Sequence, residues 1–172
     1  AVARERREEF LKRYGGKISS EWMMAKIWQT LDEAPEVYAA ADKFVEAADW
    51  VIWQLTGVET RNSCTAGYKA IWSKQEGFPS PDFFAALHPK MRTIVADKMS
   101  ERILPLGVRA GGLTAEMADA TGLPRGTAVA VANVDAHASV PAATVVGTGI
   151  MVMIMGTSTC HMVVGDTQKI VP

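Results

Sequence analysis

Two short polar segments carry the side chains of this 172-residue chain that are best suited to chemistry. Asp135 follows the apolar residues 128–132 and precedes a run of small residues, and the turn 156–159 (GTST) follows the apolar residues 150–155. A carboxylate can accept a proton from an attacking hydroxyl group. A glycine turn with hydroxyl groups and free backbone N–H groups can hold phosphate oxygens. Together they are the parts that a phosphoryl-transfer site needs.

Each segment also has a simpler interpretation, which the residues alone leave open. Asp135 suits the N-cap of the helix that follows it, a role that contributes about 1 kcal/mol. The turn 156–159 suits a β-hairpin, and it is not a Walker loop, because no GK[ST] follows a glycine-rich run. Asp135 and His137 can also be taken as two metal ligands, although no second cluster of His, Asp or Glu lies near them in the sequence.

The elements that must position these residues are mostly helical over the first hundred positions. Pro35 suits the first turn of a short helix. Ser19 or Ser20 suits the N-cap of one helix, Thr114 suits the start of a later one, and Thr56-Gly57 suits a helix end. The apolar spacing predicts further helices over residues 4–14, 22–31, 44–55, 64–72, 83–87, 91–99, 113–121 and 136–143.

Strands are expected only after residue 105, where glycine, valine and alanine replace the long charged side chains. Residues 128–132 form a short, wholly apolar run typical of a buried strand. Residues 150–155 and 160–164 are expected to form two strands joined by the turn, with alternating methionines packing one strand face. The fold class is therefore α/β, with a helix-rich first portion followed by strands.

Composition excludes several classes of protein. A hydrophobic content of 48% with 22% charged residues is ordinary for a globular domain, and a net charge of −1 argues against nucleic-acid binding. No apolar run approaches the roughly 18 residues that span a bilayer, and the first residues are too charged for a secretory signal. Cys64 and Cys160 lie far apart without a CxxC pair, so we expect free thiols and a cytoplasmic protein.

The order of several motifs resembles the middle of a carbohydrate kinase of the FGGY family, most closely of those members that phosphorylate L-ribulose. The motifs are AKIWQTLDEAPEVY (25–38), ADWVIWQLTG (48–57), RNSCTAGYKAIW (61–72), the run from GLTAEM to VDAHAS (112–139) and MGTSTCHMV (155–163). The resemblance covers essentially the whole chain. It implies part of a two-domain, actin-like ATPase fold built from ribonuclease-H-like domains. Residues 1–146 would be the later part of the first, sugar-binding domain, and residues 147–172 the first strands of the second, ATP-binding domain.

The resemblance also implies roles for individual residues. Asp135 matches the general base that takes the proton from the C5 hydroxyl of the ketose, and it would lie near Mg²⁺, through water. Lys69 matches a lysine that contacts the sugar, whereas on spacing alone it is a helical lysine with its ammonium in solvent. The turn would contact the ATP phosphates through four residues: Gly156 and Thr157, with Ser158 and Thr159 as helpers.

The implied reaction is ATP-dependent phosphorylation of L-ribulose to L-ribulose 5-phosphate, a step of arabinose catabolism, with ATP and Mg²⁺ as cofactors. The implied partners are small molecules, without nucleic acid or membrane, and a homodimer stays open. Three alternatives remain: another FGGY kinase acting on ribitol, D-ribulose or xylulose, a non-catalytic binding module in which Asp135 is a helix cap, and a metal-dependent hydrolase using Asp135 and His137.

The chain departs from the family in what it lacks. Family members are much longer and carry an N-terminal DxGT-type phosphate hairpin, early sugar-binding residues and a glycine-rich adenosine site, none of which occurs here. We therefore expect an internal fragment, without kinase activity by itself.

Overall fold

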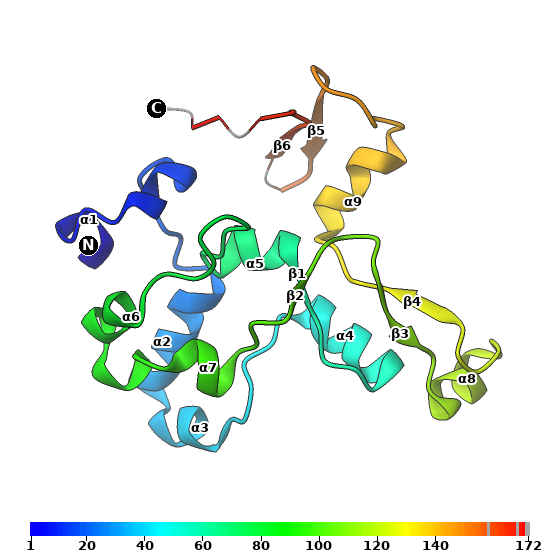
Figure 1. Ribbon diagram of the computed structural model, residues 1–172, viewed down its shortest axis with the longest axis horizontal. Coiled ribbons are helices and arrows are strands. Elements are labelled where there is room, and N and C mark those ends of the chain that lie inside the picture. The colour runs from blue at the N-terminus through cyan, green and yellow to red at the C-terminus, as the bar shows by residue number, and fades with distance from the viewer. Residues whose placement is uncertain (158, 168, 171–172) are drawn as a thin grey trace.

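The computed structural model describes residues 1–157, 159–167 and 169–170. Helices make up most of the first hundred residues, a strand pair with one helix extends to one side of them, and a hairpin beside another helix lies at the C-terminal end (Figure 1). The helices are α1 (Val2–Glu5), η1 (Glu9–Tyr14), α2 (Met23–Glu33), α3 (Pro35–Ala40), α4 (Ala47–Thr56), α5 (Ser63–Lys69), α6 (Pro81–Leu87), η2 (Pro89–Met91), α7 (Ile94–Lys98), α8 (Ala115–Thr121) and α9 (Asp135–Ala142). The strands are β1 (Arg61–Asn62), β2 (Ile103–Leu104), β3 (Arg109–Gly112), β4 (Ala128–Ala130), β5 (Met151–Met155) and β6 (Thr159–Val163).

The hydrophobic core lies among the helices of the first hundred residues. Helix α2 contributes one face of four buried side chains, spaced as an amphipathic helix requires. The remaining core side chains come from η1, α3, α6, η2, α7 and the segments that follow α5 and α7: Phe10, Leu11, Tyr38, Ala70, Ile71, Phe83, Phe84, Met91, Ile94 and Met99. This core supports α5, the helix that ends at Lys69.

Several helix ends follow the local signals that predicted them. Pro35 begins α3. Gly57 ends α4 in the left-handed conformation at φ 70°, which glycine adopts without steric cost. Thr114 caps α8 by accepting a hydrogen bond from the backbone N–H of Met117 at 3.2 Å. These predictions are confirmed because each depends on one or two neighbouring residues.

Other local predictions are wrong. The expected helix over residues 4–14 is divided into α1 and η1, because Arg7 lies in the left-handed region at φ 54°. Neither Ser19 nor Ser20 caps α2, whose N-cap is Trp22 without a side-chain hydrogen bond. Strand β4 is not buried, since two of its three residues are exposed.

A buried polar network joins α4, β1 and α5. The Asp49 side chain is only 2% exposed, and its Oδ1 accepts hydrogen bonds from the backbone N–H of Asn62 at 3.0 Å and from Asn62 Nδ2 at 2.8 Å. Asn62 in turn caps α5 by accepting from the backbone N–H of Thr65 at 2.6 Å. The network therefore sets where α5 begins.

The described strands pair in three two-stranded sheets. β1 and β2 are parallel, with Arg61 opposite Ile103. β3 and β4 are antiparallel, and glycine is required at Gly112 because a Cβ there would lie 2.7 Å from the carbonyl oxygen of Gly126. β5 and β6 form the predicted antiparallel hairpin.

The alternating methionines of β5, expected to pack one strand face, are instead exposed: Met151, Met153 and Met155. The face that they form has no cover among the described residues. Within the same part of the chain, no helix has both the length and the apolar character needed to cross a membrane.

Candidate functional site

Asp135 is the first residue of α9, directly after the extended Val134. Its carboxylate is exposed, and Oδ1 accepts a hydrogen bond from the neighbouring backbone N–H of Ala136 at 2.7 Å. Asp135 is not the N-cap of α9, because Val134 occupies that position and Asp135 is the first residue of the helix. A carboxylate in this position is favoured by the helix dipole and keeps its other oxygen accessible.

His137 lies two residues after Asp135 in the same turn and contacts α5. Its Nδ1 is 2.6 Å from Sγ of Cys64, and the edge of its ring meets the ring of Tyr68, with centroids 5.6 Å apart. Burial raises the pKa of the Cys64 thiol and lowers the pKa of His137, the latter opposed by the Asp135 carboxylate. The pair at neutral pH is therefore a thiol beside a neutral imidazole, not an activated thiolate.

Lys69 ends α5 and pairs with a carboxylate that the sequence did not single out. Its Nζ lies 3.7 Å from Oε2 of Glu46, the residue that precedes α4. Burial raises the pKa of the Glu46 carboxyl, and the Lys69 ammonium opposes that rise. Both residues line a cavity of about 210 Å³ beside α2, and the Lys69 side chain is partly buried, with 36% of its surface exposed.

The turn after β5 is exposed in this chain. Gly156, Thr157 and Thr159 are all exposed, and Thr159 is already the first residue of β6, opposite Met155. Ser158, the fourth residue predicted to contact phosphate, lies outside the described residues. The hairpin interpretation is confirmed, and it does not conflict with phosphate binding by the same turn.

The structure brings some of these residues together and leaves others apart. Helix α9 contacts both β5 and β6, and the start of α9 lies near α5 (Figure 1). Among the described residues, no hydrogen bond or ion pair joins Asp135, Lys69 and the turn directly. Helix α5 connects Lys69 and Asp135 indirectly. Lys69 is its last residue, and its Cys64 contacts His137 of α9, the helix that begins with Asp135.

No group of three or more His, Cys, Asp or Glu side chains within the described ranges is arranged to hold a metal ion. Asp135 and His137 therefore lack the further ligands that a protein-bound zinc site requires. A single exposed carboxylate is compatible with Mg²⁺ held mainly by substrate phosphates and water.

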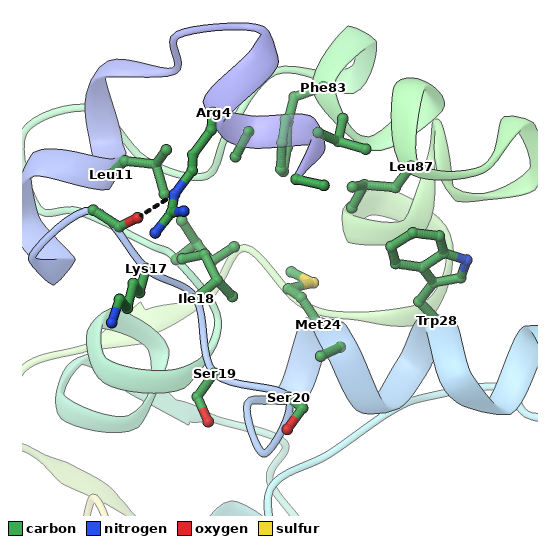
Figure 2. A pocket seen from close by; sticks show the side chains of 16 residues that line it. Arg4, Leu11, Lys17, Ile18, Ser19, Ser20, Met24, Trp28, Phe83 and Leu87 are labelled. Atoms are coloured by element: carbon green, nitrogen blue, oxygen red, sulfur yellow. Dashed lines mark hydrogen bonds between the residues drawn. The ribbon is translucent and has the colours of Figure 1, made fainter.

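The chain also has an apolar cavity of about 470 Å³ away from these residues. Figure 2 shows Met24 and Trp28 of α2 lining it with Phe83 and Leu87 of α6, while Arg4 donates to the carbonyl oxygen of Gly16 at 3.0 Å. None of the predicted site residues lines this cavity. It lacks converging polar groups of the kind that phosphoryl transfer needs, so we do not assign the site to it.

Sequence reasoning missed Glu46 and Cys64. A carboxylate directly before the apolar run of α4 was the only local signal for Glu46. Cys64 offered none, because its partner His137 lies 73 residues further along the chain.

Known proteins similar to this chain match it over nearly its whole length, and they are carbohydrate kinases. No model of a protein family matches. The chain is 58% identical over 171 residues to the ribulokinase of Bacillus licheniformis, covering 99% of this chain and 31% of that protein. It is 59% identical to the ribulokinase of Geobacillus thermodenitrificans and 52% identical to that of Mycolicibacterium smegmatis, covering 99% and 100% of this chain and 30% of each relative.

Solved structures show the same fold. The xylulose kinase of Rhodospirillum rubrum matches with a TM-score of 0.77 and 25% identity, over 99% of this chain and 35% of that one. A ligand-bound xylulose kinase of Lactobacillus acidophilus matches with a TM-score of 0.65 over 93% of this chain and 32% of that one, at 14% identity, which supports the fold alone.

The chain spans about 30% of the length of the curated relatives that it matches. The resemblance to carbohydrate kinases of the FGGY family is confirmed: nearly the whole chain is homologous to the corresponding third of bacterial ribulokinases and has the fold of sugar kinases of the actin-like ATPase type.

Proposed function

We propose that a protein containing this chain phosphorylates L-ribulose to L-ribulose 5-phosphate with ATP, and that Asp135 is the general base. The observation that supports this most directly is an exposed carboxylate at the start of α9 in a chain 58% identical to a ribulokinase. Homology covers only about a third of such a protein, so the activity belongs to the longer polypeptide. We expect no turnover from the 172-residue chain alone.

In the proposed step, the free carboxylate oxygen of Asp135 takes the proton from the C5 hydroxyl of the ketose. That transfer takes place late, as the C5 oxygen forms a bond to the γ-phosphorus of ATP and the bond from that phosphorus to the β–γ bridging oxygen breaks, so ADP leaves. A carboxylate can serve as this base, because the hydroxyl proton is lost late in a loose transition state. Exposure of Asp135 in this chain leaves it free to meet a substrate.

Lys69 would bind the sugar as a hydrogen-bond donor. Its ammonium has three donors and only one ionic partner among the described residues, the Glu46 carboxylate at 3.7 Å. That distance leaves donors available for ketose oxygens while Glu46 limits the directions that the long side chain samples.

The turn after β5 would contact the ATP phosphates. Gly156 and Thr157 are exposed at the tip of the hairpin, where backbone N–H groups are not used by the strand ladder, and Thr159 and Ser158 would assist. Mg²⁺ bound to ATP would neutralise charge that develops on the phosphates, with Asp135 as its nearest protein carboxylate, through water. The proposal includes the domain division, with residues 1–146 in the sugar-binding domain and 147–172 in the ATP-binding domain.

The nearest alternative is a kinase of the same family acting on ribitol, D-ribulose or xylulose. Identities of 52–59% to ribulokinases, against 25% to a xylulose kinase, favour ribulose. A substrate panel would separate these sugars.

The test is a chimera in which these 172 residues replace the matching segment of the Bacillus licheniformis ribulokinase. In that chimera, Asp135→Asn should lower kcat by about 100- to 10,000-fold, the usual contribution of a general base, with the KM for L-ribulose changed little. Asp119→Asn on α8, the same change at another exposed aspartate, is the control and should leave kcat unaltered. Near-normal turnover by the Asp135 variant would refute the proposed base.

A further inference from the structure

Helix α9, which begins with Asp135, has little apolar packing of its own. Its sequence is DAHASVPA, and none of its residues is buried. Among the described residues, the side-chain hydrogen bonds and ring contacts that join α9 to another element all involve His137. Helix α9 also contacts β5 and β6, but its side-chain link to α5, the helix that carries Lys69, is through His137.

The side chain of Cys64 is in direct contact with the imidazole of His137. Sγ of Cys64 lies 2.6 Å from Nδ1 of His137. We assign the thiol S–H as the donor and Nδ1 as the acceptor. A neutral imidazole has one nitrogen with a free lone pair, and a thiol can donate to it. Cys64 lies in the first turn of α5 and His137 in the first turn of α9, so the contact joins the starts of the two helices.

The ring of His137 also rests on a row of aromatic side chains. Tyr68 of α5 meets His137 at 5.6 Å between centroids and Trp22 at 5.9 Å. Trp22 then meets Tyr14 at 4.9 Å, and the Tyr14 hydroxyl donates to the carbonyl oxygen of Gly67 in α5 at 2.6 Å. The imidazole is therefore connected to the helical core through Tyr68, which is 45% exposed, Trp22 and the partly buried Tyr14.

We propose that His137 and Cys64 are positioning residues, which fix the start of α9 against α5 and thereby aim the Asp135 carboxylate. The inference rests on the proposed function, in which Asp135 is the base and Lys69, at the other end of α5, binds the sugar. Because Asp135 is two residues before His137, a shift of the imidazole moves the carboxylate with it. A displacement of about 1 Å in a reacting group can cost about 100-fold in rate.

The test uses the same chimera and three substitutions. His137→Phe keeps a ring against Tyr68 and removes the acceptor, Cys64→Ala removes the donor, and Cys64→Ser keeps a donor. We expect the first two to lower kcat by about 10-fold or more with the KM for L-ribulose within about 3-fold of the parent, and Cys64→Ser to recover most of the lost kcat. His161→Phe, at an exposed histidine of β6, is the matched control and should leave kcat unchanged.

Combination with Asp135→Asn separates positioning from a merely structural role. If His137 acts through Asp135, adding His137→Phe to Asp135→Asn should lower kcat no further, whereas a general loss of folding would lower it in both backgrounds. If Asp135→Asn loses most of its kcat while Cys64→Ala and His137→Phe keep a normal kcat, the inference is overturned and the proposed function stands. Normal turnover in Asp135→Asn would overturn the proposed function and the inference with it. If His137→Phe fails to fold, the comparison of Cys64→Ala with Cys64→Ser decides the same question.

Discussion

Asp49 offers the sharpest test of what holds α4, β1 and α5 together. Replacement by alanine leaves two buried donors of Asn62, the backbone N–H and Nδ2, without the carboxylate oxygen that now accepts from both. A buried donor without a partner costs about 1–3 kcal/mol. Part of that loss is offset, because Asp49→Ala also removes a carboxyl group whose pKa is raised by burial and which is therefore costly to bury charged.

We expect Asp49→Ala to lower the free energy of unfolding by about 3 kcal/mol and Asp49→Asn by about 1 kcal/mol or less, because the asparagine amide oxygen can accept both hydrogen bonds. For a chain of this size, 1 kcal/mol corresponds to roughly 2–4 °C in Tm, so the alanine variant should melt about 6–12 °C lower. The assay is urea and thermal unfolding of the 172-residue chain followed by tryptophan fluorescence. Asp119→Ala, at an exposed position, is the control.

The difference in unfolding free energy between the wild type and Asp49→Asn should depend on pH in a defined direction. Burial is the largest cause of the raised pKa of Asp49, opposed by the Asn62 hydrogen bonds and by Arg61. A carboxyl with a raised folded pKa contributes stability below its unfolded pKa, about 3.9, and loses that contribution as pH rises through the folded pKa. The free energy of unfolding of the wild type, relative to that of Asp49→Asn, should therefore be larger at pH 4 than at pH 7. An advantage that grows with pH, or equal losses in the alanine and asparagine variants, would refute the reasoning.

Two further predictions concern the site and the strand pair. In the chimera, Glu46→Gln should raise the KM for L-ribulose about 2- to 5-fold with kcat nearly constant, because a half-exposed ion pair contributes up to about 1 kcal/mol to holding Lys69. Asp82→Asn, which removes the exposed ion pair of Asp82 with Arg92 away from this cavity, is the matched control, and an unchanged KM in both variants would count against a role for Glu46. Gly112→Ala should destabilise the chain by about 1–3 kcal/mol, since its Cβ would lie 2.7 Å from the Gly126 carbonyl oxygen and 2.9 Å from its Cα. Gly147→Ala, with no atom within 4 Å of the added Cβ, should change the unfolding free energy little, and similar losses from the two glycine variants would exclude the close contact as the cause.

Local signals predicted much of the secondary structure. The start of α3 at Pro35, the end of α4 at Gly57 and the cap of α8 at Thr114 each depend on the conformational preference of one residue or on one hydrogen bond within a turn. The β5–β6 hairpin is similarly local, since its two strands flank one short turn. The prediction of one helix over residues 4–14 was wrong, because Arg7 adopts the left-handed conformation and divides that segment into α1 and η1.

Burial could not be predicted from apolar content. The run 128–132 is wholly apolar, yet two of the three residues of β4 are exposed, since β3 is its one pairing partner within the described part of the chain. The methionines of β5 are exposed as well. Asp49 shows the converse, since a charged residue on a helix is fully buried by its partners on β1.

The sequence by itself determined the family resemblance and the helix-rich order of the elements, because motif order and spacing are linear properties of the chain. It also predicted which residues match the family's base, sugar contact and phosphate turn. Only the tertiary structure decided how those residues are held. The Glu46 partner of Lys69 and the Cys64 partner of His137 come from helices distant in sequence, the latter separated by 73 positions. Such contacts depend on how α4, α5 and α9 pack, and no periodicity or motif along the chain encodes which side chains that packing brings within hydrogen-bonding distance.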